Sequence, residues 1–196
     1  MKGHYIVFEG IDGSGKTSIC SKIADCLIQH GYKVLQISEP SHSDIGLLLR
    51  NQMENLHVNQ TSLALLYAAD SYDLQERIED CYDFIISDRN YLSTVAYQMM
   101  YVDKAWLLRL HQFLKQPDMV FYLNVTVEVA MARIANRNGN IDFFENSESL
   151  TKVKNNYEKL ISDELGIQIY CIETAGKSQT IVVQNVMEII QEQLSL

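Results

Sequence analysis

A glycine-rich segment near the N-terminus reads Gly10-Ile11-Asp12-Gly13-Ser14-Gly15-Lys16-Thr17. It matches the phosphate-binding pattern GxxxxGK[ST] at every defined position. Glycines allow consecutive backbone N–H groups to turn toward phosphate oxygens, and the start of a following helix adds a partial positive charge. The segment therefore predicts a loop that binds the phosphates of a nucleoside triphosphate.

The residues on either side of this loop support the same interpretation. A β-rich run over residues 4–9 precedes it, and apolar residues at helical spacing over 16–30 follow it. In such a loop, Lys16 supplies a positive charge for the β- and γ-phosphates, and the Thr17 hydroxyl is able to ligate Mg²⁺. The alternative is a glycine-rich turn that binds no ligand. The strand expected before the segment and the helix expected after it make this the weaker interpretation.

Strand and helix signals alternate along the rest of the chain. We expect further strands at residues 33–37, 84–86, 119–123 and 168–172. We expect helices at residues 45–53, 62–79, 91–101 and 150–165, a helix capped by Asp103, a helix from Thr126 to about Arg137 and a final amphipathic helix. This alternation predicts an α/β fold with a mostly parallel sheet, in which ligands bind at the carboxyl ends of the strands. Without a repeat or a break in composition, residues 1–196 are expected to form one domain.

Composition limits the class of protein. The chain has 196 residues, a net charge of −9 and four cysteines that form no CxxC pair. The negative charge argues against a broad nucleic-acid or membrane surface, and the cysteine pattern is typical of reduced thiols in the cytosol. The longest apolar run, over 63–69, is far shorter than the ~20 residues of a membrane span, and the run over 5–8 ends in Glu9, unlike a signal peptide. We expect a soluble cytoplasmic protein that binds neither nucleic acid nor membranes.

Asp88 is a second candidate site residue. It ends the apolar run Phe84-Ile85-Ile86-Ser87, which is typical of a strand buried on both faces. A carboxylate at the end of a strand beside a phosphate loop helps to hold the Mg²⁺ shell. The alternative is that Asp88 serves only the turn after the strand.

The residues after Asp88 point to a kinase. The segment over 88–98 reads DRNYLSTVAYQ, and Arg89 is able to clamp a phosphate with two parallel hydrogen bonds. Polar side chains share one face of the helix expected there, namely Ser93, Thr94, Tyr97 and Gln98. A solvated helix face would more often be charged. The chain has neither the NKxD element of a switch GTPase nor the LSGGQ signature of a transporter ATPase.

These segments resemble the thymidylate kinase family. FEGIDGSGKT, over 8–17, is close to the phosphate loop of that family, and DRNYLSTVAYQ is close to its DR-x-x-x-S-x-x-AYQ motif. Weaker matches extend the resemblance over nearly the whole chain, at Glu39-Pro40, Gly46, Arg50, LLYAAD over 65–70, Arg133, Arg137, Asp142, Glu145, Asn156 and Tyr157.

The resemblance implies a P-loop kinase fold, with a five-stranded parallel sheet flanked by helices and a short lid over about 138–147. It implies transfer of the γ-phosphoryl group of ATP to dTMP with Mg²⁺ as cofactor, which gives dTDP for dTTP synthesis. It also implies a homodimer. Two alternatives stay open: a P-loop kinase for another deoxynucleotide, dUMP or dCMP, and a non-catalytic nucleotide-binding sensor.

The resemblance also implies the site residues. The catalytic residues would be Asp12, Lys16, Asp88 and Arg89. The ATP-binding residues would be Gly10, Ile11, Asp12, Gly13, Ser14, Gly15, Lys16, Thr17, Arg133 and Arg137. The acceptor-binding residues would be Asp12, Glu39, Arg50, Arg89, Ser93, Thr94, Tyr97, Gln98, Asp142 and Glu145. Mg²⁺ would be held by Thr17 and Asp88.

Some of these roles are specific. Asp12 would meet the sugar 3′-hydroxyl, Arg89 would bridge the acceptor and donor phosphates, and Tyr97 would lie against the deoxyribose and exclude a 2′-hydroxyl. Alternatively, Tyr97 fills the core. Arg133 and Arg137 lie one helical turn apart and are able to face one polyphosphate; alternatively, they form a solvated helix end favoured by the helix dipole.

Three departures from the family pattern weaken the prediction of the base. Positions where the family often has arginine carry Ser38, Ser71 and Phe143. Contacts to the edge of the base would then come from other side chains, and Thr94 and Gln98 are candidates because they offer donors and acceptors. The residues for phosphate chemistry are all present.

Overall fold

The computed structural model describes residues 3–53, 59–136, 146–163 and 166–194. Five strands form one sheet in the order β2-β3-β1-β4-β5, and every neighbouring pair is parallel. The strands are β1 (His4–Glu9), β2 (Val34–Ser38), β3 (Phe84–Asp88), β4 (Met119–Asn124) and β5 (Ile169–Glu173). The expected α/β fold with a five-stranded parallel sheet is confirmed.

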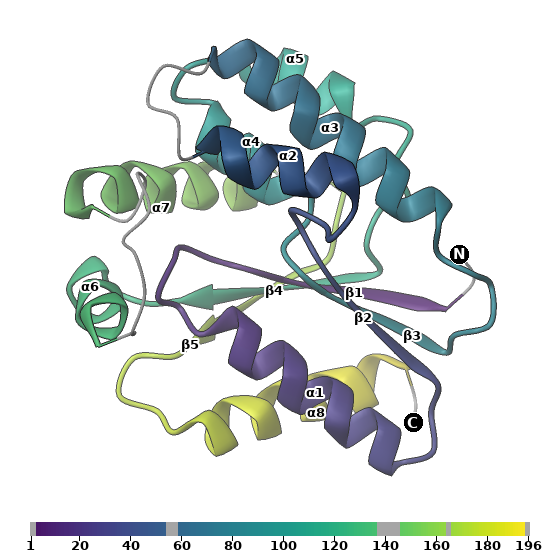
Figure 1. Cartoon of the computed structure of the whole chain (residues 1–196). Coiled ribbons are helices and arrows are strands. Elements are labelled where there is room, and N and C mark those ends of the chain that lie inside the picture. Colours follow the sequence, from purple (N-terminus) through teal and green to yellow (C-terminus); the bar gives the residue numbers. More distant parts are fainter. Residues whose placement is uncertain (1–2, 54–58, 137–145, 164–165, 195–196) are drawn as a thin grey trace.

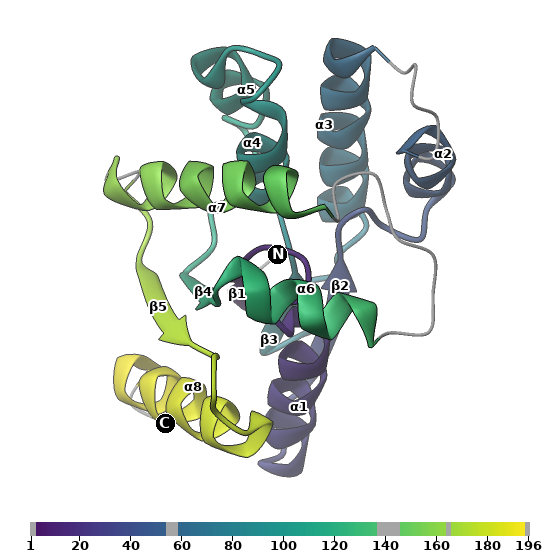
Figure 2. The ribbon, with the colours of Figure 1, turned by 90° about the vertical axis from the view of Figure 1, so that its left-hand side faces the viewer.

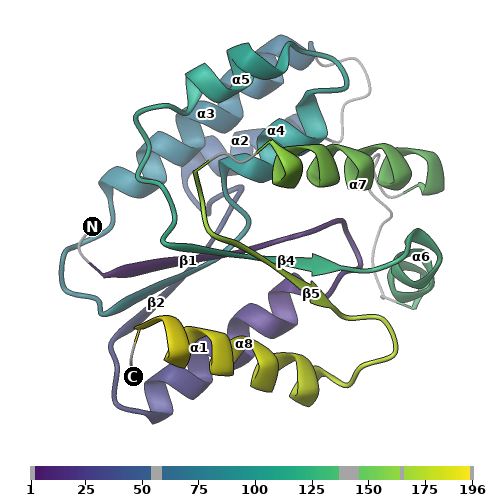
Figure 3. The same cartoon turned by 180° about the vertical axis from the view of Figure 1, so that it is seen from behind.

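Helices cover both faces of this sheet (Figure 1). The helices are α1 (Lys16–Gln29), α2 (Asp44–Met53), α3 (Gln60–Glu76), α4 (Tyr91–Gln98), α5 (Lys104–Leu110), α6 (Val127–Ala135), α7 (Ser147–Ser162) and α8 (Gln179–Leu194). Helices α1 and α8 lie together on one face, and α3, α4, α5 and α7 lie over the other; Figure 3 shows the same two layers from behind. None of the helices within the described ranges is both long and apolar enough to cross a membrane.

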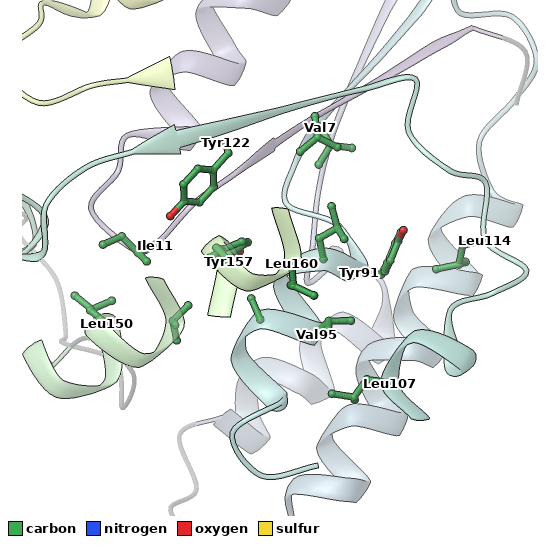
Figure 4. Close-up of a cluster of buried hydrophobic side chains, with 14 of the residues drawn as sticks. Val7, Ile11, Tyr91, Val95, Leu107, Leu114, Tyr122, Leu150, Tyr157 and Leu160 are labelled. Carbon is green, nitrogen blue, oxygen red and sulfur yellow. The ribbon is translucent and has the colours of Figure 1, made fainter. Parts of the chain in front are cut away.

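The two faces of β1 contribute to two separate hydrophobic clusters. Ile6 and Phe8 pack with α1 and α8, whereas Tyr5 and Val7 pack with the helices of the other face. Successive side chains of a strand point to opposite faces, so a strand covered on both sides needs apolar residues at every position. Figure 4 shows the second cluster, in which Tyr157 of α7 lies among residues of the sheet and of the neighbouring helices.

Helix ends account for the main differences from the expected elements. The helix expected over 91–101 ends at Gln98, because the chain turns before Asp103, whose side chain caps α5 as expected. The last helix expected before β5 begins at Ser147 rather than at residue 150, since the Asn146 side chain accepts a hydrogen bond from Ser149 N at 2.9 Å. Thr126 caps α6 as expected.

Strand register brings the candidate site together at one edge of the sheet. Phe8 of β1 and Ser38 of β2 are both paired with Asp88 of β3, so the residues that follow these strands emerge side by side. In Figure 2, which views the end of the sheet toward which β4 points in Figure 1, α6 crosses in front of the strands. Most of the lid expected over 138–147 lies outside the described residues.

Candidate active site

The glycine-rich loop joins β1 to α1, as the sequence predicts. The buried amine of Lys16 donates hydrogen bonds to the carbonyl oxygens of Gly10 and Ile11, each at 2.9 Å. Burial, together with the charge of Arg89, lowers the pKa of Lys16 to about 8, although Asp12 opposes this change. The lysine is thus held inside the loop before any ligand is bound.

The back of the loop contacts α6 closely. Gly13 has a φ of 78°, and a Cβ atom there would lie 2.4 Å from the carbonyl oxygen of Ala130. From the same helix, Arg133 donates hydrogen bonds to Gly13 O at 3.2 Å, Ser14 O at 3.1 Å and Thr174 O at 3.0 Å. Arg133 therefore connects the loop to α6 and to the end of β5. Arg137, the second arginine that we expected to contact the polyphosphate, lies outside the described residues.

Thr17 and Asp88 meet at the front of the loop. The Thr17 hydroxyl donates a hydrogen bond to Asp88 Oδ2 at 2.6 Å, and Asp88 Oδ1 is buried without a hydrogen-bond partner among the described residues. Two adjacent oxygen donors suit Mg²⁺, which is usually held by one or two protein ligands plus substrate phosphates and water. These residues fit the expected cation.

Arg89 lies at the centre of the site. Its φ is 73°, in the left-handed region that non-glycine residues seldom adopt, and its guanidinium forms an ion pair with Asp12. It also donates to Ser93 Oγ at 2.9 Å and lies 5.2 Å from the centre of the Tyr97 ring. The Tyr97 hydroxyl in turn donates to Asp12 Oδ2 at 2.8 Å. Backbone strain of this kind often accompanies a functional role, because the surrounding structure must enforce it.

Charge compensation keeps Asp12 ionised. Burial alone would raise the pKa of this carboxyl group, but the positive charges of Arg89 and Lys16 and the hydrogen bond from Tyr97 together lower it to about 2. Asp12 therefore stays negatively charged at any pH at which the protein would be assayed. It is a fixed acceptor beside the loop.

Two cavities meet at this cluster. The first, of about 440 Å³, is lined by the glycine-rich loop, Asp88, Arg133, Thr174 and Lys177. The second, of about 320 Å³, is lined by Glu39, Pro40, Arg50, Met53, Tyr67, Asn90, Ser93, Thr94 and Tyr97. Asp12 and Arg89 line both cavities. Ligands in the two cavities would thus contact the same arginine and the same carboxylate.

The predicted acceptor residues fall into three groups. Glu39, Arg50, Ser93, Thr94 and Tyr97 line the second cavity with Asp12 and Arg89. Gln98 is fully buried, is absent from the cavity lining, and its amide has no hydrogen-bond partner within the described part of the chain. Asp142 and Glu145 lie outside the described residues, so their roles stay predictions.

Arg50 is engaged by the backbone at the mouth of this cavity. Its guanidinium donates to the carbonyl oxygens of Ser41, at 2.6 Å, and of Pro40. These contacts connect α2 to the loop after β2. The side chain that we expected to contact an acceptor thus also shapes the cavity wall.

Sequence reasoning missed Glu9, the last residue of β1. Its buried carboxylate accepts hydrogen bonds from Asn90 N at 2.9 Å, Ser93 N at 3.2 Å, Ser93 Oγ at 2.6 Å and the Tyr157 hydroxyl at 2.6 Å. It thereby holds the start of α4, directly after Arg89. The local signal was an acidic residue directly after the apolar run over 5–8.

The sequence comparisons agree with this geometry. A profile of the thymidylate kinase family matches residues 8–192. The chain belongs to the thymidylate kinase family. It is 34% identical to the thymidylate kinase of Brachyspira hyodysenteriae over 199 aligned positions, which cover 98% of this chain and 95% of the relative. It is 38% identical to a probable thymidylate kinase of Methanobrevibacter smithii over 163 positions, which cover 81% of each chain.

A solved structure supports the thymidylate kinase fold independently. The thymidylate kinase of Candida albicans superposes with a TM-score of 0.80 at 24% identity, over 98% of this chain and 92% of that chain. The P-loop kinase fold expected from the sequence is confirmed by this likeness and by the parallel sheet.

The structure describes two of the three residues that depart from the thymidylate kinase pattern. Ser71, where the family often has arginine, is fully buried on α3 and donates a hydrogen bond to Glu39 Oε2 at 2.6 Å. Ser38 ends β2 and is partly buried, and Phe143 lies outside the described residues. At a position where the family often has arginine, the Ser71 hydroxyl group thus contacts the Glu39 carboxyl group.

Proposed function

We propose that this chain is a thymidylate kinase that transfers the γ-phosphoryl group of ATP to the 5′-phosphate of dTMP, giving dTDP for dTTP synthesis. The observation that carries the proposal is the pair of cavities that share Asp12 and Arg89. A phosphoryl transfer needs a donor and an acceptor that meet at one point, and a nucleotide sensor does not need the second cavity. Membership of the family supports the same activity.

In this proposal the first cavity holds ATP. Backbone N–H groups of the loop over 10–17 bind the phosphates, and the Lys16 ammonium stabilises charge that develops on the transferred group. Arg133 supports the loop from behind through its contacts with Gly13 and Ser14. The ATP contact of Arg137 rests on the family resemblance alone.

Mg²⁺ is the cofactor that we propose. Thr17 and Asp88 would hold it, and their adjacent oxygen atoms suit a hard divalent cation. When bound, the cation supplies neutralisation of phosphate charge. Its presence can be tested by the dependence of turnover on added MgCl₂ in enzyme treated with a chelator.

The second cavity would hold dTMP. Arg89 is positioned at the junction to bind the acceptor phosphate and the transferred group, since its guanidinium offers several donors in one plane. Asp12 would accept from the sugar 3′-hydroxyl, and Tyr97 would lie against the deoxyribose. Thr94 and Glu39 offer polar groups for the base, while Asp142 and Glu145 are assigned to the acceptor on the resemblance alone.

A panel of monophosphates tests the proposal. We expect dTMP to have the highest kcat/KM in a coupled ADP assay, followed by dUMP, because one methyl group in a pocket is worth only ~1–3 kcal/mol. A preference for dCMP or dGMP would overturn the assignment to dTMP and leave the kinase in place. Failure with all four, in protein that still binds ATP, would favour the sensor.

We further propose that the chain acts as a single kinase domain, with a lid over about 138–147, in a cytoplasmic homodimer. Leu47 and Leu48 of α2 and Leu65 of α3 are exposed, and these two helices pack against each other, which supports a protein contact there. Light scattering gives the mass of the particle in solution, and cell fractionation tests the location. A monomer at assay concentration would contradict the homodimer.

A further inference from the structure

Asp70 of α3 holds the loop that connects β2 to α2, residues 39–43. Only 1% of Asp70 is exposed, and it is absent from the lining of both cavities. Its Oδ2 atom accepts a hydrogen bond from Ser41 N at 2.7 Å, and its Oδ1 atom accepts from the hydroxyl groups of Ser41 at 2.5 Å and Ser43 at 3.1 Å. Both oxygen atoms of the buried carboxylate are thus bonded to one loop.

The same loop fixes the start of α2. The Ser43 hydroxyl accepts a hydrogen bond from Gly46 N at 3.2 Å, and Ser43 O accepts one from Leu47 N at 2.9 Å. A serine at this position caps a helix, because its side chain satisfies an N–H group that has no partner within the helix. Helix α2 therefore begins at a residue that Asp70 holds in place.

Helix α2 also lies directly against the loop. A Cβ atom on Gly46 would lie 2.0 Å from Ser41 O, so the two backbones approach as closely as glycine allows. Arg50 lies one helical turn after Gly46, and its guanidinium donates hydrogen bonds to Ser41 O at 2.6 Å and to Pro40 O. The two carbonyl groups that orient Arg50 thus belong to the loop that Asp70 holds.

Arg50 lines the second cavity and keeps donors available for a ligand there. The two hydrogen bonds to the loop use only part of its guanidinium, which offers several N–H groups in one plane. Such groups bind phosphate oxygens through short, charge-assisted hydrogen bonds. Arg50 is therefore suited to the phosphate of a monophosphate in this cavity, provided that its guanidinium is held in the right orientation.

We propose that Asp70 is a positioning residue for the acceptor: by holding the loop over 39–43, it orients Arg50 toward the phosphate of the bound monophosphate. The proposal rests on the assignment of the second cavity to the acceptor. Asp70 acts through the loop and not by contact with the ligand. Neither this loop nor Arg50 lines the first cavity, so loss of Asp70 should weaken acceptor binding and leave donor binding intact.

Isothermal titration calorimetry with dTMP and, separately, with ADP tests this role. Asp70→Ala removes the acceptor of three hydrogen bonds and should raise the dissociation constant of dTMP by roughly 10- to 100-fold, the effect of losing a hydrogen bond to a charged group. The dissociation constant of ADP should stay the same. In steady-state kinetics, KM for dTMP should rise while kcat and KM for ATP stay constant, because the lost contact is made equally in the ground state and the transition state.

Further variants separate positioning from a general loss of structure. Asp70→Asn keeps an oxygen atom that accepts from Ser41 N and should recover most of the affinity for dTMP. Asp73→Ala is the matched control, because Asp73 lies on the same helix but pairs with Arg77 at 2.8 Å; it should leave the affinity for dTMP unchanged. If Asp70→Ala does not fold, as judged by circular dichroism, Ser43→Ala removes one of the three hydrogen bonds and should give a smaller rise in the same constant.

A double-mutant cycle shows whether Asp70 acts through Arg50. Arg50→Ala alone should weaken dTMP binding, and the addition of Asp70→Ala should then have little further effect. Fold-changes that multiply in the double variant would overturn the inference, as would an unchanged affinity for dTMP in folded Asp70→Ala or an equal loss of affinity for ADP. Binding of dTMP without turnover would refute the proposed transfer and leave these affinities to decide the role of Asp70. Failure of the unmodified protein to bind dTMP would overturn both.

Discussion

Replacement of Gly13 by alanine would test how the phosphate loop depends on its contact with α6. A left-handed φ costs a non-glycine residue about 1–2 kcal/mol. In addition, the new Cβ atom would lie 2.4 Å from Ala130 O, whereas such contacts are essentially never below 3.0 Å. The loop or the helix must therefore move by at least about 0.6 Å, the difference between these distances.

This displacement should affect catalysis more than folding. Misplacement of a reacting group by about 1 Å typically costs ~10²-fold in rate, so we expect Gly13→Ala to lower kcat/KM for ATP by roughly 10- to 100-fold. The backbone strain alone should lower Tm by about 2–8 °C. Steady-state kinetics and a thermal melt measure the two effects separately.

Gly31→Ala is the matched control. Gly31 also has a left-handed φ, of 91°, but outside its chain neighbours no heavy atom of the described residues lies within 4 Å of the added Cβ. We expect a similar loss of Tm and unchanged kinetics, because Gly31 follows α1 far from both cavities. If Gly13→Ala behaves like Gly31→Ala in both assays, the close contact with α6 does not position the loop.

Substitutions at four further positions test the roles of single side chains. Lys16→Ala should lower kcat by ~10²–10³-fold in folded protein, because a preorganised positive charge is lost. Steady-state kinetics measure this effect, and an unchanged kcat would contradict the catalytic role of Lys16. Arg89→Lys should be nearly as inactive as Arg89→Ala, since lysine lacks the planar fork, and recovery of most activity would reduce Arg89 to a general counter-charge. Tyr97→Ala should admit ribonucleotides in a substrate panel, whereas Tyr97→Phe keeps the ring and the preference for deoxyribose; equal discrimination by wild type and the alanine variant would assign the ring to packing. Tyr157→Phe removes the hydrogen bond that the Tyr157 hydroxyl donates to the buried Glu9 carboxylate, and should lower the free energy of unfolding by about 1–3 kcal/mol. A urea titration measures this change, and an unchanged midpoint would contradict it.

Local sequence signals predicted the parts of the fold that depend on neighbouring residues. Several features depend only on residues a few positions away along the chain. They are the glycine-rich loop, the apolar run before Asp88, and the capping residues Asp103 and Thr126. The parallel sheet follows from the alternation of such signals. Helix ends were less predictable, because the turn after Gln98 depends on where α5 must begin.

Contacts between distant segments could not be predicted in this way. Tyr157 and Glu9 are separated by 148 positions, and no local pattern indicates that they share a hydrogen bond. Gln98 shows the limit of the helix-face argument: α4 is buried on nearly every side, so a shared face does not place a side chain in the cavity. The hydrogen bond between Ser71 and Glu39 likewise joins residues 32 positions apart, on α3 and after β2.

The sharing of Arg89 and Asp12 by both cavities has a thermodynamic consequence for ligand binding. A ligand in one cavity that draws the Arg89 guanidinium away from Asp12 changes the charge and the hydrogen-bonding groups that are available to a ligand in the other cavity. Linkage then requires reciprocity: whatever factor the donor applies to the dissociation constant of the acceptor, the acceptor applies to that of the donor. The ion pair between Arg89 and Asp12 contributes to this cooperativity, so substitution of Arg89 should change the coupling factor even where each ligand still binds alone.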